Sequence, residues 1–405
     1  MNKKLLTNGT VSQRANGRWC GSVWYQDEFG ERQRKTFSGI SKAETQKKIT
    51  NYIDEFYNQG SSSAESMETL RESMQTWLKV FKFPTVERST YDRYENTAKN
   101  QLYPTLGDMQ LRNVTAVDIK NLLNDLTQQG YAYSTTKKAY QVLHDFFQHV
   151  MQEGILQNNP MECIDMIKKA NYMAMQHKEY VATCDSITIF TKEEIEKLKA
   201  EAFQTEGKDK HPKHPQAAAY ILMLNTGLRT GEMLGVINSD IDLKNKMMTI
   251  QRGVKAVQSR DGTEKTNGTE LIVGKPKSLT SNRTIPLNSV AVDMIKKLRK
   301  ERYKGQFAPL VCAEDGGFLH PEFFRYRFYT LLDAAGIERK GLHALRHTFA
   351  TNLVNGILLP DGTRKSLSPR EVADLLGHST SEITETYYVR RDTTRLNGIT
   401  DGFDL

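Results

Sequence analysis

Residues 341–351 of this chain read Gly-Leu-His-Ala-Leu-Arg-His-Thr-Phe-Ala-Thr, followed by Leu-Leu-Gly-His at 375–378 and Thr-Glu-Thr-Tyr-Tyr-Val-Arg at 384–390. The first segment has the pattern of a helix, and side chains three positions apart lie on one face of a helix. His343 and Arg346 can therefore contact the same ligand. A phosphate group is the ligand that we expect for this pair.

The second segment places another histidine on a turn. Residues 368–371, Ser-Pro-Arg-Glu, form a capping box with proline at the first helical position, and Gly377 supplies the left-handed residue that ends a helix. His378 follows directly. About ten residues later, Tyr387 and Tyr388 lie in a segment that favours a short polar helix. We predict that one of their hydroxyl groups shares a pocket with the two histidines and the arginine.

Three further motifs lie upstream of this stretch. They are Asn-Thr-Gly-Leu-Arg-Thr-Gly-Glu at 225–232, Lys-Pro-Lys-Ser at 275–278, and Arg-Thr-Ile-Pro-Leu at 283–287. Each residue pair is weak evidence when taken singly, because a His-x-x-Arg pair is usually a solvated helix face and a tyrosine pair is usually half-buried packing. The ordered set is much more specific.

The order Arg, Lys, His-x-x-Arg, Leu-Gly-His, Tyr resembles the catalytic signature of the tyrosine recombinases, which include phage-type integrases and their relatives on integrative transposons. The resemblance covers residues 188–390. It implies a catalytic site made of six residues, which are Arg229, Lys277, His343, Arg346, His378 and Tyr388.

The choice of tyrosine depends on register. The motif favours Tyr388, because Val389 and Arg390 then occupy the place of the family's usual Tyr-x-His ending. The sequence departs from the family there, since Arg390 replaces that histidine and the loop 357–367 is longer than usual. Tyr387 is therefore an alternative nucleophile.

Composition favours a polyanionic partner in a reducing compartment. The 405 residues are long enough for two or three domains, and 56 Lys+Arg against 48 Asp+Glu leave a net charge of +8 and a pI near 9.0. Four scattered cysteines form no Cys-x-x-Cys pair, so we expect neither a zinc site nor a disulfide framework. Without a long apolar run or a signal peptide, we expect a cytoplasmic, nucleoid-associated protein with no membrane partner, metal or cofactor.

Residues 1–60 form the first expected domain, of short strands followed by a helix. Strands are predicted at 10–14, 18–25 and 31–37, and a capping box at 41–44 begins a helix to about residue 58. Alternation predicts the cations of the last strand on one face and Trp19 and Trp24 on the other. The domain is either an ordinary sheet with a solvated basic face or a sheet laid in a DNA groove; the resemblance implies an arm-type DNA-binding domain.

A flexible linker at 60–65 leads to a second domain at 66–170. Its pattern predicts helices at 67–83, 89–101, 115–129 and 134–153, and the resemblance implies a core-binding, SAM-like DNA-binding domain. The apolar spacing predicts a core that contains Leu122, Leu123, Leu126, Val142, Leu143, Phe146, Phe147 and Val150. The remaining basic, hydroxyl-bearing face suits phosphate contacts that fix position without reading sequence.

Residues 188–405 form the third expected domain, the catalytic one. It is predicted to be mostly helical with a small antiparallel sheet of strands at 247–251, 253–257, 270–274 and 283–287, and with Lys277 on a hairpin turn. The fold class is therefore α+β and multidomain. The few apolar residues of the tail 391–405 cannot pack alone, so we expect the tail to dock either on a neighbouring subunit or on its own domain.

The resemblance implies a phosphoryl-transfer mechanism. Tyrosine attacks phosphorus and leaves a 3′-phosphotyrosyl link with a free 5′-hydroxyl, so neither ATP nor metal is needed. Arg229 and Arg346 clamp the non-bridging oxygens, and Glu232 orients Arg229. Lys277 is the expected acid for the leaving oxygen and His343 is either a base toward tyrosine or a donor to phosphate, with His378 as a supporting donor.

The expected function is integration or excision of a phage or transposon element by four subunits that act on double-stranded core and arm sites. Accessory directionality and DNA-bending proteins are possible partners under this reading. One alternative is a topoisomerase of type IB, which uses the same site as a monomer but needs neither the basic first domain nor the tail. The other is a DNA-binding regulator with a decayed site, although all six positions hold the expected residue type.

Overall fold

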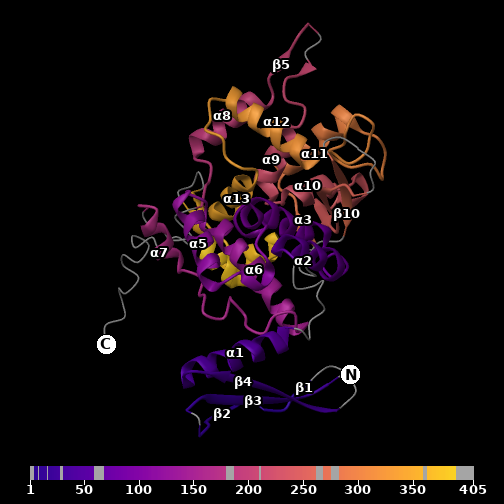
Figure 1. Cartoon of the computed structure of the whole chain (residues 1–405). Coiled ribbons are helices and arrows are strands. Elements are labelled where there is room, and N and C mark those ends of the chain that lie inside the picture. Colours follow the sequence, from indigo (N-terminus) through magenta and orange to yellow (C-terminus); the bar gives the residue numbers. More distant parts are fainter. Residues whose placement is uncertain are drawn as a thin grey trace, which may run out of the picture. The chain divides into compact units, whose positions relative to one another are not determined.

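The computed structural model divides the chain into two compact units, Met1–Glu179 and Tyr180–Leu405 (Figure 1). It describes residues 4–7, 9–15, 17–27, 31–58, 68–178, 187–208, 211–260, 268–274, 282–358 and 363–388. The expected linker at 60–65, Lys277 and the tail 391–405 lie outside these residues. Among the residues described, no helix is long and apolar enough to cross a membrane.

The first unit begins with a small antiparallel sheet. Strand β3 (Trp19–Gln26) pairs with β1 (Lys4–Leu5), β2 (Thr10–Gln13) and β4 (Arg32–Gly39). Helix α1 (Lys42–Asn58) packs against β2, β3 and β4. Val23 and Ile49 are fully buried between the sheet and this helix.

The other face of this sheet holds Arg32, Arg34 and Trp24. Trp24 is paired with Arg34, whose guanidinium carbon lies 5.4 Å from the centre of the Trp24 ring. Directly paired residues project to the same side of a sheet, so the expected separation of cations from aromatics is wrong here. The reason is the spacing of the two tryptophans. Trp19 and Trp24 are five residues apart on one strand, and side chains an odd number of residues apart project from opposite faces of a sheet.

Residues 68–178 form a helical assembly. Its helices are α2 (Leu70–Trp77), α3 (Arg88–Thr97), α4 (Tyr103–Leu106), α5 (Ala116–Gln128), α6 (Tyr133–Gln152) and α7 (Lys169–Met175). All eight residues predicted to form its core are buried. Thr69 and Thr115 begin α2 and α5 with capping boxes, which satisfy backbone N–H groups that the first turn leaves unpaired.

Two π-helical segments, η2 (Leu78–Lys82) and η3 (Ala98–Leu102), interrupt this assembly where the sequence predicted plain α-helix. The second precedes Pro104, which lacks an N–H and would clash with the preceding turn of a regular helix. The wider turn accommodates it: the Tyr103 N–H donates to the carbonyl of Ala98, five residues back. Pro104 then lies in the first turn of α4 and the helical course continues.

The second unit is built around α9 (Ala217–Thr226), a helix with nine of its ten residues buried. A helix that is apolar all round belongs inside a core. Helices α11 (Ser289–Arg302), α12 (Pro321–Ala334) and α13 (His343–Asn355) pack against it, and α8 (Lys192–Ala202) makes further contacts. Thr191 begins α8 with the capping box that the sequence indicates.

The four strands predicted to form one small sheet in this unit lie in two separate sheets. Strands β7 (Ile241–Asp242), β8 (Met247–Ile250) and β11 (Arg283–Pro286) make one, whereas β9 (Gly253–Gln258) and β10 (Thr269–Gly274) pair separately. Helix α10 (Thr230–Gly235) packs on β9, which is possible because Gly231 and Gly235 carry no side chain. A Cβ at Gly231 would lie 2.8 Å from the Val254 carbonyl oxygen, and one at Gly235 would lie 2.7 Å from that of Arg252.

The C-terminal helices complete the unit. Strands β12 (Ile357–Leu358) and β13 (Arg364–Lys365) follow α13, and then come α14 (Pro369–Leu376) and α15 (Ser381–Tyr388). The predicted capping box joins Ser368 and Glu371, and Gly377 ends α14 at φ 68°. A small core formed by Ala350, Val354, Val372, Leu376 and Tyr388 packs these helices together.

Candidate active site

Five of the six predicted site residues lie among the described residues. Four of them are at helix ends: Arg229 precedes α10, His343 begins α13, His378 follows α14, and Tyr388 ends α15. Arg346 lies one turn into α13. The sixth, Lys277, falls outside the described residues, between the ends of β10 and β11.

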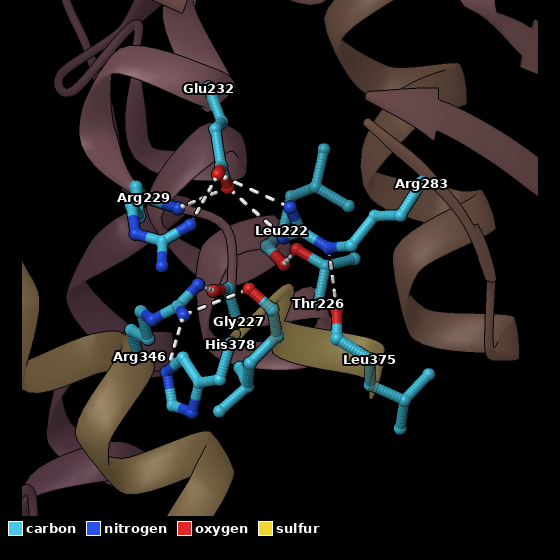
Figure 2. A network of polar contacts seen from close by, with 10 residues as sticks. Leu222, Thr226, Gly227, Arg229, Glu232, Arg283, Arg346, Leu375 and His378 are labelled. Atoms are coloured by element: carbon cyan, nitrogen blue, oxygen red, sulfur yellow. Dashed lines mark hydrogen bonds and ion pairs between the residues drawn. The ribbon is translucent and has the colours of Figure 1, made fainter. Parts of the chain in front are cut away.

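Arg346 is the central residue of the site and is 1% exposed. Its Nη1 donates to the carbonyl of Gly227 at 2.7 Å, and its Nη2 donates to the carbonyl of Leu376 at 2.9 Å (Figure 2). Nη2 also lies 3.0 Å from Nε2 of His378. All three partners are neutral. Burial, and then the charge of nearby Arg229, lower the pKa of Arg346 to about 10, so the site holds a buried cation that suits an anion.

Gly227, which ends α9, is required by its conformation and by its surroundings. Its φ is +65°, and an added Cβ would lie 2.5 Å from Cδ1 of Phe349 and 2.7 Å from Cδ2 of Leu376. Only glycine fits such a position without displacing α13 or α14. The close approach aligns the Gly227 carbonyl with the Arg346 guanidinium.

Gly227→Ala should lower the free energy of unfolding of the C-terminal unit by about 2–4 kcal/mol, since it adds left-handed strain to a clash within the core. Amide hydrogen exchange of α9 and α13 measures the loss where it occurs. Gly336→Ala is the matched control, because φ is +64° there and no atom lies within 4 Å of the added Cβ. We expect only about 1 kcal/mol at Gly336. Equal losses would show that Phe349 and Leu376 impose no constraint.

A second cluster positions Arg229. Glu232, which is 5% exposed, accepts from Arg229 Nη1 at 2.7 Å and from its backbone N–H at 3.0 Å. Arg283 donates from Nη1 and Nη2 to the same carboxylate at 3.2 and 3.0 Å (Figure 2). Burial raises the pKa of Glu232, but the hydrogen bond and charge of Arg283, followed by those of Arg229, outweigh it and lower the pKa overall. Glu232 therefore remains ionised and orients Arg229, as predicted.

Arg283 was not predicted to belong to the site. Its Nε donates to the carbonyl of Leu375 at 2.7 Å, so one side chain joins β11, α10 and α14. The signal that could have revealed it is its place at the start of the Arg-Thr-Ile-Pro-Leu motif, six residues after Lys277. Arg229 and Arg283 both donate to the carboxylate of Glu232, and, after burial, the charges of both arginines lower the pKa of nearby Arg346.

His378 accepts a hydrogen bond where the sequence predicted a donor. An arginine has no acceptor, so Nε2 of His378 must accept from Nη2 of Arg346, and Nδ1–H then donates to Oγ1 of Thr384 at 2.8 Å. Burial, followed by the charge of Arg346, lowers the pKa of His378 to about 4. The ring is therefore neutral at pH 7 and orients Arg346.

The two adjacent tyrosines occupy different environments. Tyr388 is 3% exposed and packs in the small C-terminal core, whereas Tyr387 is 41% exposed. The Tyr388 hydroxyl oxygen lies 3.0 Å from Nδ1 of His347, and Nδ2 of Asn355 donates to the Tyr388 carbonyl at 3.1 Å. Burial raises the pKa of Tyr388, although the charges of Arg346 and Arg229 oppose this effect.

His347, which the sequence reasoning missed, is the histidine that contacts the Tyr388 hydroxyl in the described part of the chain. The signal was available, because His347 follows Arg346 directly and lies four residues after His343 on the same helical face. The two imidazole rings meet edge to face with centroids 5.2 Å apart. His343 itself is solvent-exposed, and its pKa is lowered first by desolvation and then by the charges of Arg346 and Arg229.

The two histidines with strongly lowered pKa values predict a pH-dependent stability. The pKa values of His347 and His378 are about 4 in the fold, against 6.5 for a free histidine, so only the unfolded chain takes up their protons between these values. The contribution of these two histidines to the free energy of unfolding should be greatest above pH 6.5, fall by about 1 kcal/mol per partly exposed histidine on acidification to pH 5, and level off below pH 4.

Urea unfolding at pH 7 and pH 5, followed by circular dichroism, measures this difference. His378→Gln should remove part of the dependence, because glutamine does not titrate. An undiminished pH dependence in that variant would assign the loss to other groups.

Comparison with known proteins places this chain in a family. Residues 188–395 match the phage integrase family, and residues 69–127 match the N-terminal SAM-like domain of phage integrases. The chain therefore belongs to the phage integrase family, the group that the ordered motifs predicted. It is a phage-type tyrosine recombinase, and this confirms the predicted enzyme class, site-specific DNA recombination.

The relatives cover nearly the whole chain. A tyrosine recombinase XerC-like protein of Caldanaerobacter subterraneus subsp. tengcongensis is 30% identical over 90% of this chain and 89% of its own length. Among solved structures, the integrase of transposon Tn1549 in complex with a circular intermediate DNA has a TM-score of 0.60 at 18% identity, over 81% of this chain and 98% of that one. A lambda integrase tetramer bound to a Holliday junction has a TM-score of 0.55 at 17% identity, over 94% and 97%. These two structures share the fold.

Proposed function

We propose that this recombinase cleaves and rejoins DNA through a 3′-phosphotyrosyl link formed by Tyr388, and thereby integrates or excises a mobile element. The observation that carries the proposal is the burial of Tyr388 beside Arg346, whose guanidinium bonds two backbone carbonyls and the neutral ring of His378. A phosphodiester would supply the missing negative charge. Tyr387, exposed to solvent, lacks that setting.

Arg229 and Arg346 would bind the non-bridging oxygens of the scissile phosphate. Both are already fixed by the protein, Arg229 by Glu232 and Arg346 by Gly227, Leu376 and His378. Donors that are held before the reaction stabilise the charge that develops in the transition state without costly reorganisation. Glu232 and Arg283 act through Arg229 and are positioning residues.

Lys277 is proposed as the acid that protonates the departing 5′-oxygen. It lies between β10 and β11, and Arg283 at the start of β11 is bonded to the carboxylate that holds Arg229. In the sequence, Lys277 precedes Arg283 by six residues. Lysine suits this task because its pKa shifts readily when it is desolvated.

The proposed partners are double-stranded core and arm sites. The Tn1549 integrase is bound to a circular intermediate DNA in its structure, and the lambda integrase is a tetramer on a Holliday junction. We infer a homotetramer on DNA for this chain by analogy, with accessory directionality and DNA-bending proteins as further partners. The net charge of +8 supports a polyanionic ligand.

Three domains are proposed for these tasks: 1–60 for arm sites, 66–170 for the core site and 188–405 for catalysis. The SAM-like match at 69–127 supports the second. The sheet face that bears Trp24, Arg32 and Arg34 supports the first, because Arg32 and Arg34 are exposed and Trp24 is 38% exposed. Such a face can lie against the DNA backbone.

A combined Arg32→Ala and Arg34→Ala variant should bind a separate arm site less tightly and integrate poorly, yet cleave a core substrate at the wild-type rate. Each lost phosphate contact lowers the slope of log affinity against log salt by about 1, so we expect a change of about 2. Gel-shift titrations at several salt concentrations measure it. Lys47→Ala, an exposed cation on α1, is the control. Equal loss of core cleavage would contradict separate arm binding.

The experiment that tests the proposed function is trapping on a nicked suicide duplex in EDTA, followed by mapping of the modified peptide. We expect a covalent adduct on the peptide that contains Tyr388. An adduct on a serine, or none under conditions in which the protein binds the duplex, would contradict the proposal.

A further inference from the structure

Helix α13 holds Tyr388 at two points. His347 contacts the hydroxyl oxygen at 3.0 Å through Nδ1, and Asn355, two turns further along the same helix, bonds the Tyr388 carbonyl at 3.1 Å. The ring centroids of His347 and Tyr388 are 5.6 Å apart. The reacting atom of the proposed nucleophile is therefore placed by a side chain that has no assigned function in the mechanism above.

The protonation states of His347 and Tyr388 follow from their surroundings. Burial lowers the pKa of His347 to about 4, and the charges of His343 and Arg346 contribute further, whereas burial raises the pKa of Tyr388. At pH 7 the phenol is protonated and the imidazole is neutral. The hydroxyl can then donate to Nδ1, which has the free lone pair that a proton acceptor needs.

Binding of a phosphodiester would strengthen this acceptor. The groups that face His347 and Tyr388 are the cations Arg346 and Arg229, the phenol of Tyr387, His343 on α13, and His378, whose ring stacks on that of Tyr388 at 6.2 Å. An anion bound between the arginines offsets their charge and removes part of what disfavours an imidazolium. The pKa of His347 would then rise when the proton must be transferred.

We propose that His347 is the general base of this recombinase, which accepts the proton of Tyr388 as the hydroxyl oxygen attacks phosphorus. The inference rests on the proposed role of Tyr388 as the nucleophile. One bond forms between the Tyr388 oxygen and phosphorus while the bond to the 5′-oxygen breaks. The phenolic proton moves to Nδ1, and the 5′-oxygen takes a different proton, for which Lys277 is the proposed donor. In the rejoining step His347 returns its proton to Tyr388.

This assignment replaces the expectation that His343 might serve as the base. His343 lies four residues earlier on α13 and is open to solvent, whereas His347 contacts the hydroxyl directly. The exposed position of His343 suits its alternative role as a donor to the phosphate.

The test compares full-length wild type, His347→Asn and Lys277→Ala in single-turnover trapping on two suicide duplexes. One carries an ordinary scissile phosphate and the other has sulfur in place of the bridging 5′-oxygen, because a thiolate leaves without a proton. We expect His347→Asn to slow adduct formation about 100-fold on both duplexes, since general base catalysis is worth roughly that factor and the defect lies on the attacking side. Lys277→Ala should be slow only on the oxygen substrate.

The pH profile separates base catalysis from a structural effect. Asparagine can place an oxygen near the position of Nδ1 but cannot take a proton, so the rate of His347→Asn should rise with pH as the phenol ionises, whereas the wild-type rate levels off near neutrality. A structural defect would lower the rate by the same factor at every pH. Urea unfolding and gel shifts on the same preparations establish that the variant folds and binds DNA.

The outcomes distinguish the two proposals. A wild-type rate for His347→Asn, or its rescue by sulfur, would overturn the assignment of His347 while leaving the nucleophile intact. An adduct that persists in Tyr388→Phe would overturn the proposed function itself. A pH-independent deficit would make His347 a packing residue.

Discussion

Tyr388→Phe should abolish the covalent protein–DNA adduct, and Tyr387→Phe should leave it near the wild-type level. Phenylalanine keeps the ring that packs with Ala350, Val354 and Leu376 but removes the oxygen that would attack phosphorus. The expected loss is complete, because Tyr387 is 41% exposed and does not share the buried position of Tyr388. Denaturing gels of suicide-substrate reactions in EDTA measure the adduct.

Tyr387→Phe is the matched control, since it removes a hydroxyl from an adjacent residue on the same helix that is 41% exposed. The reverse result, with Tyr387 essential and Tyr388 dispensable, would leave the fold standing and show that α15 turns before the reaction. An absolute requirement for Mg²⁺ would contradict the proposed chemistry.

Arg229→Lys should reduce the rate of adduct formation about 100-fold, which corresponds to roughly 3 kcal/mol of transition-state stabilisation. Lysine retains the charge but loses the planar fork. A single ammonium group cannot bond Glu232 as Arg229 does, at 2.7 Å, and also present a fixed pair of donors to a phosphate. DNA affinity should hardly change, because many other phosphate contacts contribute to it.

Arg339→Lys provides the control for that substitution. Arg339 forms a two-point ion pair with Asp333 on the surface of the same unit, so the variant makes the same chemical change at a residue with no proposed role. We expect no measurable effect on cleavage. If Arg229→Lys loses binding in proportion to cleavage, Arg229 is a docking residue and not a transition-state donor.

Local features of the fold could be predicted from the sequence because their causes lie within a few residues. The capping boxes at Thr115, Thr191 and Ser368 are formed by partners three positions away, and Gly377 ends α14 through its own backbone conformation. The family could be identified for a different reason. The order of the motifs along the chain is a pattern of residue types, and recognising it requires no knowledge of which residues are close together in space.

The missed contacts join residues that are distant in sequence. Arg283 bonds Glu232 across 51 residues, and His347 bonds Tyr388 across 41. Periodicity can show which face of a helix a residue occupies, but it cannot show which other element covers that face. The same limit applies to the strands. Helix α10 packs closely on β9 because two of its own residues are glycines, and the alternation of the strands does not reveal this contact.

The partners of Arg346 have a consequence for the resting enzyme. Gly227 and Leu376 stand at the carboxyl ends of α9 and α14, where the aligned peptide dipoles present partial negative charge. Two helix termini thus stabilise the guanidinium of Arg346 before DNA binds. An aspartate or glutamate in direct contact would carry a full negative charge and would compete with DNA for the same cation. The enzyme can therefore be stable when empty and still remain electrostatically unsaturated toward its substrate.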